Sequence, residues 1–140
     1  MTPEQNTHVK TLTTREEIFN YVESHLKNQG QRSIPPRGAV FIDGAYRGED
    51  GTMCAVGCLL ADDEYDPGME NLSVEVVSLP ERLIPHTWML ADLQSFHDRV
   101  WNWSSDGTGP LSSRGTSQLR DLRSRWLDES ASTSDSPGSN

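Results

Sequence analysis

The sequence predicts a single α+β domain in which three main helices pack on a small β-hairpin or antiparallel sheet. Two observations lead to this prediction. Three segments repeat apolar residues at helical spacing, whereas a central segment has short β-prone runs on either side of an Asp-Gly turn. The chain of 140 residues is also long enough for one domain to bury a core without metal ions or disulfides.

The first helix is predicted over residues 15–29. Thr14 and Glu17 match a capping box, in which a hydroxyl and a carboxylate satisfy free amides at the first turn. Gly30 supplies the left-handed conformation that commonly ends a helix. The apolar stripe of this helix consists of Ile18, Phe19, Val22 and Leu26.

The β structure is predicted between residues 39 and 56. Residues 39–42 form a β-prone run, and residues 45–47 and 52–56 flank a turn at residues 48–51. Two extended runs around an Asp-Gly turn are typical of a β-hairpin.

Four further elements are expected after the hairpin. Residues 62–65 are predicted to form a helical turn, because acidic side chains suit a helix N-terminus. Residues 73–77 are a further short β-prone run. Apolar residues at helical spacing predict a second helix at about 87–103 and a third at about 116–129. Their stripes are Met89, Leu93, Phe96 and Val100 in the second helix, and Leu119, Leu122 and Trp126 in the third.

Composition divides the chain into three parts. Residues 1–12 are polar and are expected to be a flexible segment, and residues 13–129 are expected to be the folded domain. Residues 130–140 contain almost only Ser, Thr, Asp, Gly and Pro, so a disordered tail is predicted because burial cannot repay its ordering entropy. The start has no signal sequence and no apolar run approaches ~20 residues, which predicts a cytoplasmic protein without a membrane segment.

The charge pattern limits the partners. The formal net charge is −9, which argues against direct DNA binding, since that affinity depends on Lys and Arg. The charges are also uneven, which predicts a dipolar molecule. The acids cluster at Asp62, Asp63, Glu64, Asp66, Glu70 and Glu75, whereas Arg114, Arg120, Arg123 and Arg125 lie near the C-terminus.

Two motifs occur between about residues 40 and 100. The first comprises Tyr46-Arg47-Gly48, Asp50-Gly51, residues 54–60, Asp62, Tyr65 and Glu70, and the second comprises Leu93-Gln94 and His97-Asp98. This pattern resembles an uncharacterised family of small proteins encoded in bacterial and phage genomes. The resemblance implies a phage or prophage accessory protein and no particular reaction.

The motif residues are the candidate binding site, which we expect between the hairpin and the second helix. The candidates are Tyr46, Arg47, Cys54, Asp62, Tyr65, Glu70, Gln94, His97 and Asp98. We expect a non-enzymatic module that binds either a host protein with a basic surface or a small anionic ligand. In the second case Arg47 and the C-terminal arginines would hold the anion. The oligomeric state is left open.

The alternative is a small Cys/His- or metal-dependent hydrolase centred on Cys54, His97, Asp62 and Glu70. The sequence shows no complete catalytic set, and no cofactor or metal is expected. Cys54 and Cys58 on one strand would lie about 13 Å apart, too far to share a metal, so buried apolar roles are expected. Adjacent helical residues point about 100° apart, so Asp98 is expected to be poorly placed to orient His97.

Overall fold

The computed structural model describes residues 1–35 and 44–128, and this part of the chain is helical. Its α-helices are α1 (Pro3–Val9), α2 (Arg15–Gln29), α3 (Thr87–Asp98) and α4 (Ser113–Leu127). Short 3₁₀ segments occupy much of the remaining chain, namely η1 (Glu49–Gly51), η2 (Gly57–Leu59), η3 (Asp62–Glu64), η4 (Pro67–Met69), η5 (Glu81–His86), η6 (Val100–Asn102) and η7 (Ser105–Gly107).

The predicted first helix is confirmed as α2. Thr14 accepts a hydrogen bond from the Glu17 amide at 3.1 Å, and the Glu17 carboxylate accepts one from the Thr14 amide at 3.1 Å. Gly30 ends the helix with a φ of 72°. All the signals that place α2 lie within or beside it in the sequence, so local chemistry is enough to define both ends.

The other two predicted helices exist with different ends. α3 stops at Asp98 because side chains from beyond the helix bind its last carbonyls: Asn102 donates to the Phe96 carbonyl and Trp103 donates to the His97 carbonyl, each at 2.9 Å. α4 begins three residues earlier than predicted, at Ser113. The Ser112 hydroxyl accepts the Gly115 amide at 3.0 Å and caps it.

The α+β prediction is wrong for the described residues, which contain no β-strand. Pairing is limited to isolated antiparallel bridges between Arg47 and Met53 and between Trp103 and Leu111. The Asp50-Gly51 turn forms, but the ladder ends after one bridge. The chain then turns at Cys54, whose carbonyl accepts the Cys58 amide at 3.1 Å.

Other short elements also differ from expectation. Residues 73–77 form a turn rather than a strand, since the Ser73 carbonyl accepts the amides of residues 76 and 77. The helical turn predicted at 62–65 is confirmed as η3. The β-prone run at 39–42 and the tail at 130–140 lie outside the described residues.

Residues 1–12, expected to be flexible, contain helix α1. Thr2 and Gln5 form a capping box at its start, and Val9 is completely buried. Asn6 binds Asp62 in both directions, through its side-chain amide at 3.1 Å and through the Asp62 amide at 2.7 Å. The burial of Val9 and these contacts attach α1 to the body of the protein.

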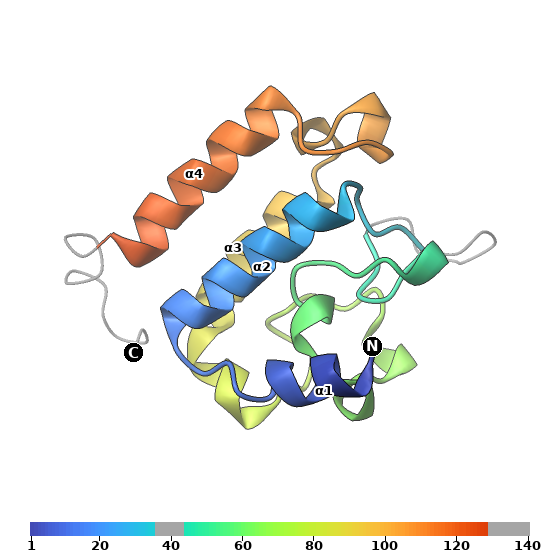
Figure 1. Cartoon of the computed structure of the whole chain (residues 1–140), viewed down its shortest axis with the longest axis vertical. Helices are drawn as coiled ribbons and strands as arrows, with labels where there is room; N and C mark the ends of the chain where they lie inside the picture. The colour runs from blue at the N-terminus through green and yellow to red at the C-terminus, as the bar shows by residue number, and fades with distance from the viewer. Residues whose placement is uncertain (36–43, 129–140) are drawn as a thin grey trace.

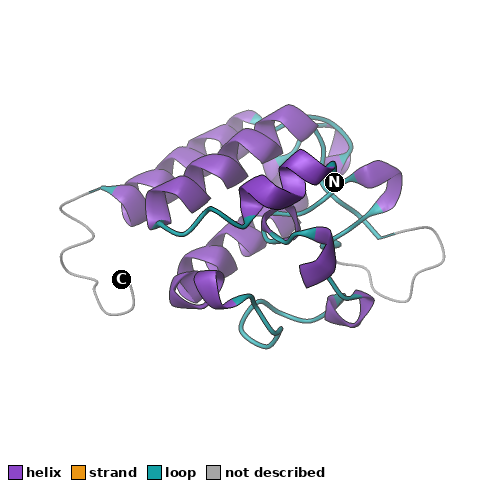
Figure 2. Cartoon of the chain, turned by 60° about the horizontal axis from the view of Figure 1, so that its bottom comes forward, coloured by secondary structure: helices purple, strands orange, loops and turns teal. Residues whose placement is uncertain are grey.

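The helices and the irregular segments occupy different parts of the molecule (Figure 1). α4 packs on both α2 and α3, while η2 packs on α2. The green segments of Figure 1, from residue 44 to about 80, lie beside the helices, and Figure 2 shows them as loops and single turns. None of the helices in the described part is long and apolar enough to cross a membrane.

One apolar core joins the two parts. Its completely buried members come from the helices and from the irregular segment alike. They include Ile18, Phe19, Val22 and Leu26 in α2, Leu90 and Leu93 in α3, and Cys54, Val56, Leu59 and Leu60 in the irregular segment. The irregular segment is therefore part of the folded core, although it has no ladder or long helix of its own.

Candidate functional site

The candidate residues divide into two groups in the structure. Gln94, His97 and Asp98 gather at the C-terminal end of α3, close to the turn that contains Cys54. Asp62 and Tyr65 gather instead around Arg47 and Glu70. Tyr46 belongs to both groups, because its amide contacts Glu70 and it lines a cavity together with residues of α3.

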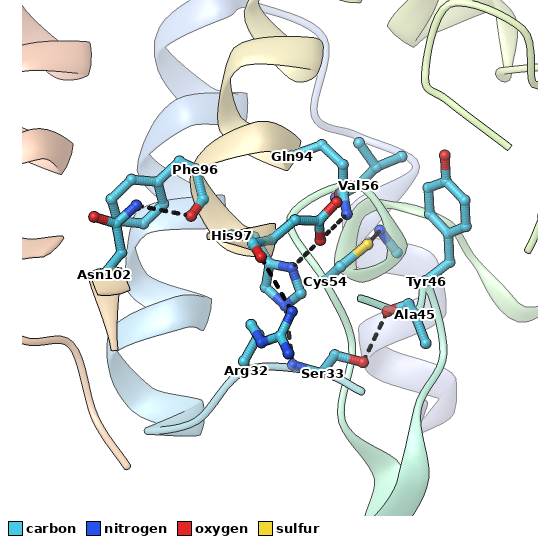
Figure 3. A network of polar contacts seen from close by, with 12 residues as sticks. Arg32, Ser33, Ala45, Tyr46, Cys54, Val56, Gln94, Phe96, His97 and Asn102 are labelled. Carbon is cyan, nitrogen blue, oxygen red and sulfur yellow. Dashed lines mark hydrogen bonds and ion pairs between the residues drawn. The ribbon is translucent and has the colours of Figure 1, made fainter. Parts of the chain in front are cut away.

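His97 is fully buried and its protonation state follows from its partners (Figure 3). The backbone amide of Ser33 donates to His97 Nε2 at 2.9 Å, so Nε2 accepts and Nδ1 carries the proton. Nδ1 then donates to Asp98 Oδ1 at 2.8 Å. Burial lowers the pKa of His97, although the hydrogen bond to Asp98 opposes this, and the ring is neutral at pH 7.

The prediction that Asp98 is poorly placed to orient His97 was therefore wrong. The 100° argument compares the directions of Cα–Cβ bonds, whereas the contact is made by the far atoms of both side chains. Asp98 is also the last residue of α3, where Arg99 has already left the helical conformation with a ψ of 115°. Gly44 packs against this pair so closely that a Cβ there would collide with Asp98 Oδ1 and lie 2.7 Å from His97 Cε1.

Gln94 fixes Asp98 from the other side and links α3 to η2. Its Nε2 donates to Asp98 Oδ1 at 3.1 Å, and its Oε1 accepts the Val56 amide at 3.3 Å. Two donors thus converge on Oδ1 of one carboxylate. No hydrogen bond reaches Oδ2 from any residue in the described ranges, and the Asp98 side chain is 29% exposed.

A cavity of about 260 Å³ lies between this network and the irregular segment. It is lined by Gly44, Tyr46, residues 71–75, Ala91, Gln94, Ser95 and Asp98. Tyr46 is 4% exposed, and its hydroxyl donates to the Leu72 carbonyl at 2.6 Å, which holds the ring in place. Three of the nine candidate residues, Tyr46, Gln94 and Asp98, therefore meet at one cavity.

Sequence reasoning missed the other lining residues. Ala91 and Ser95 could have been found, because Ser95 precedes Asp98 by three positions and Ala91 precedes Ser95 by four, which places all three on one helix face. Residues 71–75 carry no such signal. They reach the cavity through a turn that starts at Asn71, whose φ of 65° is unusual for a residue other than glycine.

The cavity is acidic. Among the described residues that line it, the charged ones are Asp98 and Glu75, and both are carboxylates. Burial raises the pKa of Tyr46, and nearby negative charge, including that of Asp98 and Glu75, raises it further. The charged groups that a ligand would meet in the described lining are therefore both negative.

The second group surrounds Arg47. Its guanidinium donates to Asp62 Oδ1 and to the Leu60 carbonyl, each at 2.8 Å, and lies 4.9 Å from the centre of the Tyr65 ring. Hydrogen bonds from Asn6 and Arg47 lower the pKa of Asp62 to about 2. Arg47 is thus neutralised within the protein, which is a poor arrangement for holding a small anion.

Glu70 organises the backbone of the same group. Its two carboxylate oxygens accept the amides of Tyr46 and Arg47 at 2.9 and 3.0 Å, and Oε2 also accepts the Tyr65 hydroxyl at 2.6 Å. Glu70 is therefore committed to internal hydrogen bonds, as a residue that supports the turn.

The cysteines do not form an activated nucleophile. Cys54 and Cys58 are free and fully buried, and they lie in consecutive turns rather than on one strand. Burial raises the pKa of Cys54 to about 12 and also raises that of Cys58, so both are thiols at pH 7. The described residues contain no group of three or more His, Cys, Asp or Glu side chains arranged to hold a metal ion.

The arrangement offers an oriented carboxylate and a cavity lined by Tyr46 and two serines. The described ranges contain no metal cluster, and the thiol of Cys54 is not activated. Comparisons of the chain with models of known protein families, with curated proteins and with solved structures found no match.

Proposed function

We propose that this protein is a non-enzymatic binding module that holds a small ligand in the cavity between Tyr46 and α3. The observation that carries the proposal is the oriented carboxylate of Asp98, whose Oδ1 is held by His97 and Gln94 while Oδ2 has no partner among the described residues. In the phage or prophage setting that the motifs suggest, such a module would act as an accessory factor.

Preorganisation supports this proposal. A binding site needs few polar groups if they are already fixed, because little freedom is then lost when the ligand binds. His97 is buried and tied to Ser33, so the side chain that orients Asp98 is itself held in place. A buried network of this kind, opening into a cavity with a Tyr46 wall, meets the physical requirement for a small-ligand site.

The hydrolase alternative gains no observation of its own. A thiol with a pKa of about 12 is not a nucleophile at pH 7, and His97 has both ring nitrogens engaged by Ser33 and Asp98. Asp62 and Glu70 are bound to other parts of the protein. The binding proposal is therefore preferred.

A fragment screen by ¹H–¹⁵N NMR tests the proposal. Ligands of the cavity are expected to shift the amide signals of Ala91, Gln94, Ser95 and Asp98. Replacing Ala91 by Leu fills part of the cavity and should abolish these shifts, whereas Ala91→Ser adds little volume and should retain them. The proposal fails if no fragment shifts these amides, or if Ala91→Leu binds as well as the unmodified protein.

A further inference from the structure

We infer that the ligand of this cavity is a small organic cation, specifically a primary alkylammonium, whose charge pairs with Asp98 Oδ2. This inference rests on the proposed function and adds the chemical class of the ligand.

The first argument is charge. His97 is neutral because Nε2 accepts the Ser33 amide, so its hydrogen bond orients Asp98 without cancelling the carboxylate charge. Arg32 lies nearby, but its Nη1 donates to the main-chain carbonyl of Asp98 at 3.1 Å and not to the carboxylate. A partly buried carboxylate that has no cationic partner within residues 1–35 and 44–128 favours a ligand that supplies one.

The second argument is the geometry of the free acceptor. A guanidinium binds a carboxylate best through two parallel hydrogen bonds, one to each oxygen. Here Oδ1 already accepts from His97 and Gln94, at 2.8 and 3.1 Å, so Oδ2 alone is available. An ammonium group is a compact charge that needs a single carboxylate oxygen, and the hydroxyls of Ser73 and Ser95 line the same cavity as further acceptors.

The third argument is size and polarity. The cavity of about 260 Å³ is smaller than the roughly 300–1,000 Å³ of sites for drug-sized molecules, which limits the ligand to a short chain. Tyr46, Val74 and Ala91 provide an apolar surface for that chain, and Val74 is 3% exposed. A ligand with a charged head group and a short alkyl chain therefore matches both the polar and the apolar residues of the lining.

The test is an NMR titration with four matched probes: n-butylammonium, n-butylguanidinium, 1-butanol and butyrate. We expect n-butylammonium to shift the Gln94, Ser95 and Asp98 amides with the highest affinity. Loss of a charge-assisted hydrogen bond corresponds to about tenfold or more in the dissociation constant, so 1-butanol should bind at least that much more weakly. The guanidinium probe should rank between them, and butyrate should not bind.

Two variants and a control locate the charge. Asp98→Asn keeps the shape and can still accept from His97 and Gln94, but it should weaken n-butylammonium binding about tenfold or more. Glu75→Gln, at an exposed position of the lining, should have a smaller effect. Glu16→Gln removes the same charge from the exposed surface of α2 and should have none. If Asp98→Asn does not fold, the comparison of n-butylammonium with 1-butanol on the unmodified protein decides, since these probes differ in the charge of the head group.

The outcomes separate the two proposals. If 1-butanol or butyrate shifts the cavity amides more strongly than n-butylammonium, the inference is overturned and the binding function stands. The inference also fails if the guanidinium binds more tightly than the ammonium, or if Asp98→Asn and Glu16→Gln have equal effects. If none of the four probes shifts the cavity amides and the fragment screen also finds nothing, the proposed function fails as well.

Discussion

The helices and the irregular segment from residue 44 to about 80 are stabilised by different interactions. α2, α3 and α4 pair most of their backbone groups within the helix and contribute apolar stripes to the core. The irregular segment instead depends on polar side chains that bind its backbone: Gln29 binds both the amide and the carbonyl of Met53, and Glu70 binds two successive amides. Where no ladder forms, buried backbone groups require such partners, and polar side chains then do the stabilising.

Truncating the core of the helices should have the largest effect. Phe19 is completely buried in α2, so Phe19→Ala is expected to lower the free energy of unfolding by about 3–5 kcal/mol. Urea unfolding followed by circular dichroism measures this change, and Phe19→Leu serves as a control with a smaller loss. A cost below about 1 kcal/mol would show that the helical core is not packed as described.

A single polar side chain that binds the irregular segment from outside should matter almost as much. Arg82 is 12% exposed; it donates to the carbonyls of Val9 and Leu59 at 3.1 and 2.6 Å, and to Glu64 at 2.7 Å. Arg82→Met is expected to cost about 2–3 kcal/mol, because it leaves these acceptors without a donor.

Arg82→Lys separates charge from geometry. Lysine keeps the charge but lacks the planar fork that reaches three acceptors, so it should recover less than half of the loss. Full recovery by lysine would mean that only the ion pair with Glu64 matters. The comparison between the two parts of the molecule would then be weaker than the contacts suggest.

Glu70 gives the next smaller effect. In Glu70→Gln, either orientation of the amide places an NH₂ group against the amide of Tyr46 or of Arg47, so about 1–2 kcal/mol should be lost. Thermal unfolding measures this loss. Glu16→Gln, at an exposed position of α2, is the comparison variant and is expected to cost less. Equal costs would contradict the special role of Glu70.

The pH dependence tests the network beside the cavity. The pKa of His97 is lower in the folded protein than its ordinary value of about 6.5, so the unfolded state binds more protons. The stability that neutral His97 contributes is therefore fully present above about pH 6.5. It is lost as the pH falls below this value, by up to about 1.4 kcal/mol per pH unit.

His25 needs a control in that experiment, because burial lowers its pKa as well. Urea unfolding between pH 5 and 7 should show a shallower slope for His97→Gln than for the unmodified protein. His25→Gln should reduce this slope only by the contribution of His25. An unchanged slope in His97→Gln would show that this histidine does not report on the network.

Helix capping gives the smallest effect. Thr14→Ala removes the side-chain acceptor for the Glu17 amide and is expected to cost about 1 kcal/mol, whereas Thr14→Ser should cost little. Chemical denaturation of the three proteins measures this. A loss larger than that of Arg82→Met would reverse the proposed order, in which the polar contacts of the irregular part outweigh the caps of the helices.

Predictions from the sequence were accurate where the determining residues are neighbours in the chain. α2 could be predicted to the residue because Thr14, Glu17 and Gly30 act on their neighbours. The end of α3 could not, since Asn102 and Trp103 bind its carbonyls only after the chain has turned back. The prediction of a strand at 52–56 was also wrong, because contacts with distant parts of the chain determine the conformation there.

At 52–56, local β propensity competes with a packed turn. The apolar residues of this run are β-prone, but burying Cys54 and Val56 against the helices is compatible with consecutive turns, which the 3₁₀ segment η2 continues. Gly57 lies so close to the Tyr46 carbonyl that a Cβ there would collide with it. This close approach fixes the turn, and it cannot be predicted from the β propensities of the individual residues.

The candidate site was only partly predictable. The motifs contain Tyr46, Gln94 and Asp98, which line the cavity, but also Arg47 and Glu70, which serve the backbone of the turn. A motif shows that residues occur together and does not say which of them face a ligand. That distinction depends on the hydrogen bonds each side chain already makes.

By itself, the sequence determined the start and end of α2, the apolar faces of the helices and the excess of acidic charge, since each depends on neighbours or on composition. Only the tertiary structure decided which hydrogen bonds the polar side chains make. His97 meets Ser33 across 64 positions, and Gln94 meets Val56 across 38. Long-range hydrogen bonds of this kind form only when packing has brought both partners together, and here they build the cavity.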